Sequence, residues 1–202
     1  MSFNEAGFNH DRDHRIHLAA KKKDLNGVRE QLTRGISPNL ETGNLRKTTP
    51  LMFAVNHPVP HLPIAKLLIE YKAEVNKTDA FGQTPLHLAT HVPTVEYLLD
   101  QKGDINMGKF SNFKTSNAQH ELESPTESFT PLMMASYWSW SPQVSTLVER
   151  KADIRAQSVT GETAIDILLR ENPTDRAKLE LLQSTCKLMV CLKMVCRKSL
   201  VD

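Results

Sequence analysis

The chain has 202 residues, of which 40% are hydrophobic and 24% are charged, and its formal net charge is +2. This composition is ordinary for a soluble globular protein, and the charge is too mild to favour nucleic-acid binding, which needs a concentrated basic face. The three cysteines fall within 186–196 and make no disulfide framework, so we expect a reducing, cytoplasmic location. The longest uninterrupted apolar run, 188–192, is too short for a transmembrane segment, and residues 1–13 lack the apolar core of a secretory signal.

A six-residue pattern recurs along the chain. Its best copy, residues 84–89, reads Thr-Pro-Leu-His-Leu-Ala, and close copies lie at 49–54 and 130–135. Degenerate copies lie near both ends, at 14–20 and 163–168. The third residues of the five copies are 35, 35, 46 and 33 positions apart, and they are Ile16, Leu51, Leu86, Leu132 and Ile165. A period in the low thirties predicts stacked repeats.

Each copy predicts the start of a short helix. Thr is a good N-cap, and Pro suits the first helical position because its missing N–H would be unpaired there in any case. A second amphipathic stretch follows the sextet, with apolar residues at helical spacing such as Ala65, Leu68 and Ile69. Gly82 and Gly161 lie in the connections, where turns need a positive φ. No such unit buries its apolar face alone, so the units must stack.

The sextet and its period resemble the ankyrin repeat. The resemblance covers residues 14–184 and implies an all-α solenoid of about five helix-turn-helix units with hairpin-like connections and a C-terminal helix. The expected organisation is a flexible N-terminal arm at 1–13, units one to five at 14–39, 40–76, 77–106, 107–155 and 156–184, and a helical tail at 185–202. We expect the protein to be a monomer.

Three stretches depart from a regular array. Unit three is short, because its inter-helix turn around His91 has lost about three residues relative to units one and four. Unit four begins with an insertion at 107–129, rich in Ser, Asn and Thr, which we expect to project from the hairpin side. The tail at 185–202 admits two interpretations. It is either a helix that caps unit five or a helix that docks onto a partner or a membrane surface.

The sequence contains no pattern typical of catalysis, and we predict no catalytic residues, no cofactor and no metal ion. A nucleophile elbow, a phosphate-binding loop and a dinucleotide fingerprint are all missing from it. His57 and His61 have no neighbouring carboxylate or cysteine to complete a zinc site. His17 and His87 occupy the same sextet position, and the ankyrin resemblance implies that this histidine is structural and hydrogen-bonds within the turn network.

A partner-binding surface is what the resemblance implies instead. In ankyrin proteins the hairpin tips contact partners, as do the two residues that follow the Ala pair of the first helix. Carried over, these positions and the aromatic residues near them are Leu45, Arg46, Ala80, Phe81, Gln83, His91, Phe110, Phe113, Phe129, Tyr137, Trp138, Trp140, Val159 and Glu162.

The aromatic turn at 137–140 stands out in this set, because aromatic side chains are the preferred anchors of protein interfaces. Ser139 stands where the ankyrin pattern has glycine. The turn admits two interpretations: Trp138 binds a partner, or one tryptophan folds over the adjacent unit.

The predicted function is protein–protein recognition on the concave face of the array. The alternative is an adaptor or regulatory subunit that uses the tail as a second contact. Ankyrin arrays of this size also occur among bacterial effectors that act in the host cytosol. We expect no enzymatic activity. Asn76 and Asn106 resemble the sites of the asparaginyl hydroxylase that acts on ankyrin domains, although such side chains also hydrogen-bond the hairpin backbone.

Overall fold

The computed structural model describes residues 10–56, 60–108 and 128–171. Within these residues the chain forms nine helices and no strand. They are α1 (His10–Lys22), α2 (Leu25–Thr33), α3 (Pro50–Val55), α4 (Leu62–Glu70), α5 (Pro85–Leu88), α6 (Val92–Asp100), α7 (Pro131–Tyr137), α8 (Ser141–Glu149) and α9 (Ala164–Glu171). The predictions for Phe110, Phe113 and the tail at 185–202 lie outside the described residues.

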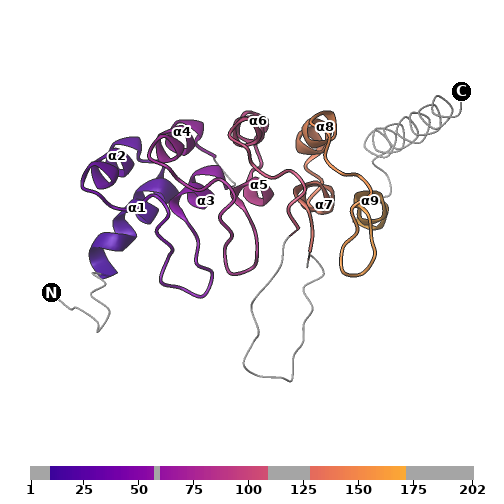
Figure 1. Cartoon of the computed structure of the whole chain (residues 1–202), viewed down its shortest axis with the longest axis horizontal. Helices are drawn as coiled ribbons and strands as arrows, with labels where there is room; N and C mark the ends of the chain where they lie inside the picture. The colour runs from indigo at the N-terminus through magenta and orange to yellow at the C-terminus, as the bar shows by residue number, and fades with distance from the viewer. Residues whose placement is uncertain (1–9, 57–59, 109–127, 172–202) are drawn as a thin grey trace, which may run out of the picture.

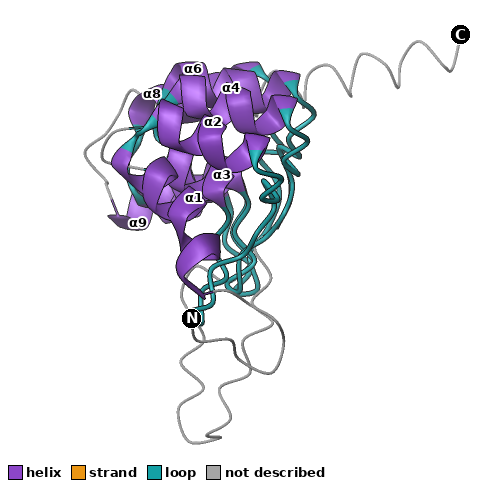
Figure 2. Cartoon of the chain, turned by 90° about the vertical axis from the view of Figure 1, so that its left-hand side faces the viewer, coloured by secondary structure: helices purple, strands orange, loops and turns teal. Residues whose placement is uncertain are grey.

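The helices alternate between two layers along the array (Figure 1). One layer contains α1, α3, α5, α7 and α9, which we call the inner helices, and the other contains the outer helices α2, α4, α6 and α8. The loops that join an outer helix to the next inner helix project from the same side of the array, as the view along it shows (Figure 2). This arrangement confirms the predicted all-α solenoid of helix pairs.

The Thr-Pro sextets begin the inner helices as predicted. Thr49 and Thr130 are N-caps whose side-chain oxygens accept hydrogen bonds from the backbone N–H groups of Met52 and Met133, at 3.4 and 3.3 Å. The Thr163 side-chain oxygen likewise accepts from the backbone N–H of Asp166 at 3.4 Å, and the Asp166 carboxylate in turn accepts hydrogen bonds from the backbone N–H and the hydroxyl of Thr163, at 2.9 and 2.7 Å. Each helix start therefore satisfies backbone donors that would otherwise be unpaired.

The hydrophobic core follows the sextets from unit to unit. The third sextet residues of the first four copies, Ile16, Leu51, Leu86 and Leu132, are all buried. In the last copy Ile165 is only partly buried. The small residues Ala20, Ala54 and Ala135 are also buried on the inner helices, and Ala89 is buried directly after α5. Small side chains at these positions let neighbouring units approach closely, so the core is continuous along the array.

The two sextet histidines connect consecutive units. Nε2 of His17 lies 2.8 Å from the carbonyl oxygen of Leu40, and Nε2 of His87 lies 2.9 Å from that of Phe129. Nδ1 of His87 accepts a hydrogen bond from the backbone N–H of Thr84 at 3.1 Å, so Nε2 carries the ring proton and donates it to Phe129. Both histidines are buried, and the structural prediction for them is confirmed.

Three asparagines form a second series of bonds between units. The side-chain oxygens of Asn39, Asn76 and Asn106 accept hydrogen bonds from the backbone N–H groups of Glu74, Asp104 and Asp153, at 2.7, 2.8 and 2.8 Å. The side-chain amides of the first two donate to the carbonyls of Lys72 and Lys102, each at 3.1 Å. The acceptor role expected for Asn76 and Asn106 is present, but the backbone that they bind belongs to the next unit.

Two boundaries differ from the sequence-based expectation. Helix α1 begins at His10, so its first turn includes residues of the arm expected at 1–13. Helix α5 has only four residues, because the chain turns extended at Ala89 and pairs there with Asn56 in an isolated antiparallel bridge. The shortened turn of unit three is therefore accommodated by ending its inner helix early.

Candidate functional site

Four predicted site residues from two neighbouring hairpins meet in one cluster, which we call the Arg46 cluster. Nε of Arg46 lies 3.2 Å from a carboxylate oxygen of Asp79, and a terminal guanidinium nitrogen donates to the side-chain oxygen of Gln83 at 2.9 Å. The guanidinium lies over the ring of Phe81, 5.7 Å from its centroid. The backbone N–H of Ala80 donates to the carbonyl of Arg46 at 2.8 Å. These contacts join the hairpins of units two and three.

Asp79 is the centre of this cluster and was not among the predicted residues. Its side chain is fully buried, and one carboxylate oxygen accepts hydrogen bonds from the backbone N–H groups of Phe81 and Gln83, at 2.9 and 2.8 Å. Gly82 follows in the same turn with a φ of 72°. The sequence signal for this role of Asp79 is an Asp three residues before a turn glycine, because Asp side chains commonly accept hydrogen bonds from the backbone of a turn.

The remaining predicted hairpin residues fall into two groups. Leu45 and Val159 are exposed at hairpin tips, by 76% and 59%, and Phe81 is exposed by 37% despite its contact with Arg46. Glu162 instead uses its carboxylate within the protein, because it pairs with Arg170 and accepts a hydrogen bond from the Thr160 hydroxyl. The tips therefore combine exposed apolar side chains with polar side chains that hold the hairpins.

The aromatic turn of unit four is built on a left-handed residue. Ser139 has a φ of 58°, which confirms that the position needs the conformation expected of glycine. The Tyr137 and Trp138 rings meet edge to face at a centroid distance of 5.1 Å, and the Trp138 and Trp140 rings stack at 6.5 Å. Tyr137 and Trp140 also pack partly against the core. Trp138 is 57% exposed.

Phe129 was predicted to contact a partner, and the structure corrects this prediction. Its side chain is 0% exposed, and its ring meets that of Tyr137 at a centroid distance of 6.1 Å. The residue directly precedes the N-cap of α7, so its backbone enters the layer of the inner helices and carries the side chain into the core. Phe129 therefore packs against Tyr137 inside the core and is not part of the candidate surface.

Four more polar side chains lie at or just after the ends of the inner helices α1 and α5. Lys21 and Lys22 are exposed in the last turn of α1. Lys23 is different, because its ammonium donates to the carbonyl of Phe53 in the next unit at 2.7 Å, and burial lowers the pKa of that ammonium. His91 is exposed and is the N-cap residue of α6, but its ring makes no capping hydrogen bond.

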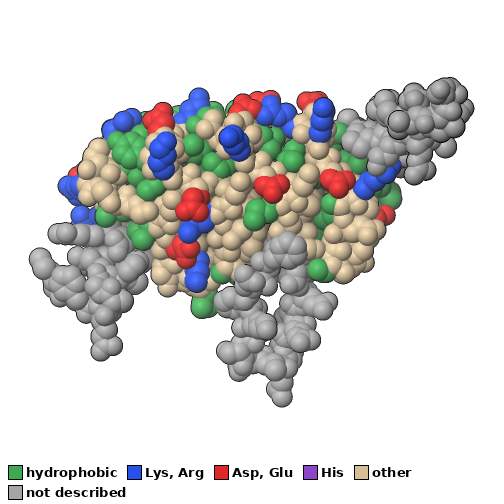
Figure 3. Space-filling view, viewed as in Figure 1, with side chains coloured by type: hydrophobic (Ala, Val, Ile, Leu, Met, Phe, Trp, Pro, Cys, Tyr) green, Lys and Arg blue, Asp and Glu red, His purple; other side chains and the backbone are tan. Residues whose placement is uncertain are grey.

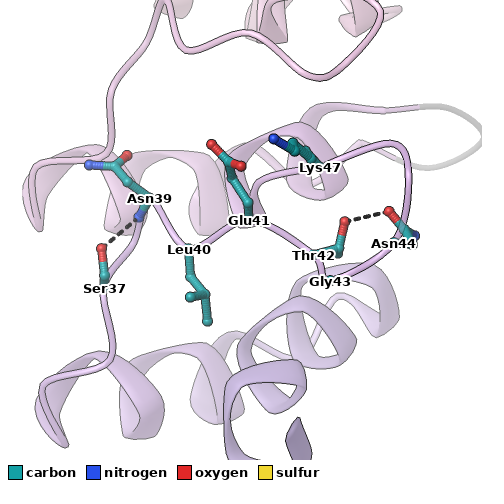
Figure 4. A pocket seen from close by; sticks show the side chains of 8 residues that line it. All are labelled: Ser37, Asn39, Leu40, Glu41, Thr42, Gly43, Asn44 and Lys47. Carbon is teal, nitrogen blue, oxygen red and sulfur yellow. Dashed lines mark hydrogen bonds between the residues drawn. The ribbon is translucent and has the colours of Figure 1, made fainter. Parts of the chain in front are cut away.

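A shallow hollow of about 470 Å³ lies in the loop that leads from unit one to unit two (Figure 4). Its lining residues are Ser37, Asn39, Leu40, Glu41, Thr42, Gly43, Asn44 and Lys47. Hydrogen bonds within the loop hold it open, from the Asn39 backbone to the Ser37 hydroxyl and from the Thr42 hydroxyl to the Asn44 side chain. Glu41 pairs with Lys77 of the next hairpin at 3.1 Å, so its carboxylate already has a cationic partner.

Within the described parts of the chain, no group of three or more His, Cys, Asp or Glu side chains is arranged to hold a metal ion. Likewise, none of the helices described is both long and apolar enough to cross a membrane. Basic and acidic side chains alternate over the outer helices on the face seen in Figure 3, so that face carries no concentrated charge of one sign.

Comparison with known proteins identifies the repeat. The family model described as "Ankyrin repeats (3 copies)" matches residues 16–109. Residues 16–109 are ankyrin repeats. The chain is also 28% identical over 115 residues to proteins of Mus musculus and Rattus norvegicus named "Ankyrin repeat and SAM domain-containing protein 6". That match covers 55% of this chain and 11% of each relative, so the chain spans a small part of their length.

The match to ankyrin repeats indicates a general class of function. Ankyrin repeats are generally protein–protein interaction modules and are generally non-catalytic. The matched segment contains the Arg46 cluster and His91, whereas the aromatic turn at 137–140 lies beyond it. Helices α7 and α8 nevertheless continue the same two layers, so the stack of helix pairs extends through unit four (Figure 1).

Proposed function

We propose that this chain is a protein-recognition module whose binding surface runs across the ends of the inner helices and the hairpin tips, with Trp138 as its main anchor. The observation that carries the proposal is the exposure of Trp138 beside two aromatic rings that hold it in place. A large aromatic side chain that is ordered before binding loses little conformational entropy when a partner covers it. Such residues supply most of the binding energy of protein interfaces.

The hairpin tips extend this surface. Leu45, Phe81 and Val159 expose apolar area on hairpins of three different units. Arg46 and Gln83 hold Phe81 in position rather than reaching outward. The adaptor alternative adds a second contact through residues 185–202 to this surface, and it does not replace the surface.

The experiment that tests the proposal compares Trp138→Ala with Tyr71→Ala. Tyr71 is exposed by 38% at the end of outer helix α4, so its truncation removes a partly exposed aromatic side chain outside the aromatic turn. Immobilised wild type and both variants are incubated with cell extract, and the captured proteins are quantified by mass spectrometry. Loss of an aromatic hot spot costs about 2 kcal/mol, or roughly a thirtyfold loss of affinity.

We expect proteins that wild type and Tyr71→Ala capture equally and that Trp138→Ala loses. Circular dichroism checks that both variants keep the helical content of wild type. If Trp138→Ala captures the same proteins in the same amounts as wild type, Trp138 is not the anchor and the proposal is wrong.

A further inference from the structure

Unit one has a polar residue where the other units have a core leucine. Each of the outer helices α2, α4, α6 and α8 has nine residues, and the seventh is a leucine in the last three, namely Leu68, Leu98 and Leu147. In α2 the seventh residue is Gln31, which is as deeply placed as the leucines, with only 6% of its surface exposed. Burial of an amide is unfavourable unless the amide has hydrogen-bond partners, so the partners of Gln31 decide what this residue does.

Gln31 lines a hollow of about 400 Å³ on unit one. The other lining residues are Arg15 of α1, Arg34 at the end of α2 and Ile36 of the turn that follows. The backbone N–H of Ile36 donates to the carbonyl of Gln31 at 3.1 Å, which fixes this side of the hollow. The side-chain amide of Gln31 has no hydrogen-bond partner among the residues that the structure describes. It can therefore bond a molecule that enters the hollow.

The charges that line the hollow favour a ligand with a single negative charge. Arg15 is exposed and forms no ion pair with any residue in the described part of the chain. Arg34 already pairs with Glu30 one turn earlier on α2, so these two side chains together carry no net charge. One positive charge is therefore uncompensated, and a carboxylate matches it. A phosphate dianion would bring a second negative charge toward Glu30 and is disfavoured.

We propose that this hollow binds a small organic carboxylate. The guanidinium of Arg15 and the amide N–H of Gln31 donate to the carboxylate oxygens, and Ile36 packs against a short apolar body. The volume lies within the range of about 300–1,000 Å³ that is usual for small-molecule sites. Polar residues on a terminal unit also face water because no further unit covers them, which would explain Arg15 and Gln31 without a ligand. That explanation predicts no preference for a carboxylate, so binding measurements separate the two.

The test adds isovalerate, a short branched carboxylate, to the full chain labelled with nitrogen-15 and follows the NMR spectrum. We expect the side-chain amide signals of Gln31 and the Nε–H signal of Arg15 to shift, with half-saturation at about 1 mM, which is typical of ligands this small. Isovaleramide has the same shape without the charge and should leave both signals in place. If the two compounds shift these signals equally, or if neither shifts them, the inference is wrong.

Two variants test the assignment of the residues. Gln31→Leu introduces the residue that the other outer helices have at this position, so it should fold, and Arg15→Gln removes the uncompensated charge. Each should weaken isovalerate binding about tenfold, read from the signal of the residue that remains. The control is Arg29→Gln, which removes the same charge from an exposed position of α2 outside the hollow and should bind as wild type does. Unchanged binding in both hollow variants, or an equal loss in the control, would overturn the inference and would leave the protein-recognition proposal for Trp138 unaffected.

Discussion

The Arg46 cluster and the aromatic turn of unit four both expose an aromatic ring, but they use it differently. Phe81 lies under the guanidinium of Arg46, whose other contacts reach Asp79 and Gln83. The Trp138 ring meets the rings of Tyr137 and Trp140 of its own turn, and Trp138 is 57% exposed. One ring is therefore part of the joint between two hairpins, whereas the other is available to a partner.

This difference shows that position in the repeat does not decide what a surface residue does. Arg46, Phe81 and Trp138 all occupy positions that carry partner contacts in ankyrin proteins. The first two have strong internal partners, and changes to them are expected to alter stability and binding together. Changes to Trp138 are expected to alter binding alone.

The largest expected effect is on the buried ring beneath the aromatic turn. Phe129→Ala should lower the free energy of unfolding by about 3–5 kcal/mol, because it leaves a cavity where a fully buried ring had been. Trp138→Ala should lower it by less than about 1 kcal/mol, because exposed positions contribute little. Urea denaturation followed by circular dichroism measures both. Equal losses would show that the aromatic turn is one structural unit.

Breaking the Arg46 cluster, which joins the hairpins of units two and three, should cause the second largest loss of stability. Arg46→Ala should cost about 2 kcal/mol, because it leaves the buried carboxylate of Asp79 without its cation, although the half-exposed guanidinium reduces the loss. Lys77→Ala is the matched control, because it breaks the more exposed pair with Glu41 and should cost below about 1 kcal/mol. If the two variants are equally stable in urea, the Arg46 cluster is a surface ion pair like any other.

The asparagine hydrogen bonds allow the junction between units two and three to be compared with the junction between units three and four. Asn106→Ala should cost about 1 kcal/mol, because it leaves the backbone N–H of Asp153 without its acceptor. Asn76→Ala should cost a similar amount, but there the Arg46 cluster and the short hairpin still hold unit three. Hydrogen exchange should therefore speed up more at Asp153 in Asn106→Ala than at Asp104 in Asn76→Ala. The reverse order would place the weaker junction between units two and three.

The smallest expected effect is on the pH dependence of α9. Hydrogen bonds from the Thr163 hydroxyl and backbone hold the pKa of Asp166 below its ordinary value. A carboxyl whose pKa is lower in the folded state stabilises the fold above its unfolded pKa, and that contribution disappears as the pH falls through the folded pKa. Unfolding of wild type and Asp166→Asn should therefore converge below about pH 4. Curves that stay parallel down to about pH 2 would contradict this assignment.

Much of the fold could be predicted because its signals are local. The Thr caps at Thr49 and Thr130, the left-handed residues Gly82 and Ser139, and the helix pairs all follow from a few neighbouring residues. The candidate surface could be predicted only as a set of positions. Arg46 bonds Asp79 and Gln83, which are 33 and 37 positions away in the sequence. No local pattern around Arg46 therefore predicts these partners.

The sequence by itself determined the repeat and its period, because both depend on backbone geometry within one unit. The face on which partner contacts were expected was implied by the resemblance to ankyrin repeats. Only the tertiary structure decided that Phe129 is core, that Arg46 supports Phe81, and that Asn76 and Asn106 bond the next unit. These outcomes depend on the distance between stacked units. That distance is set by the small residues buried between the inner helices, such as Ala54 and Ala135, and by every other side chain packed with them.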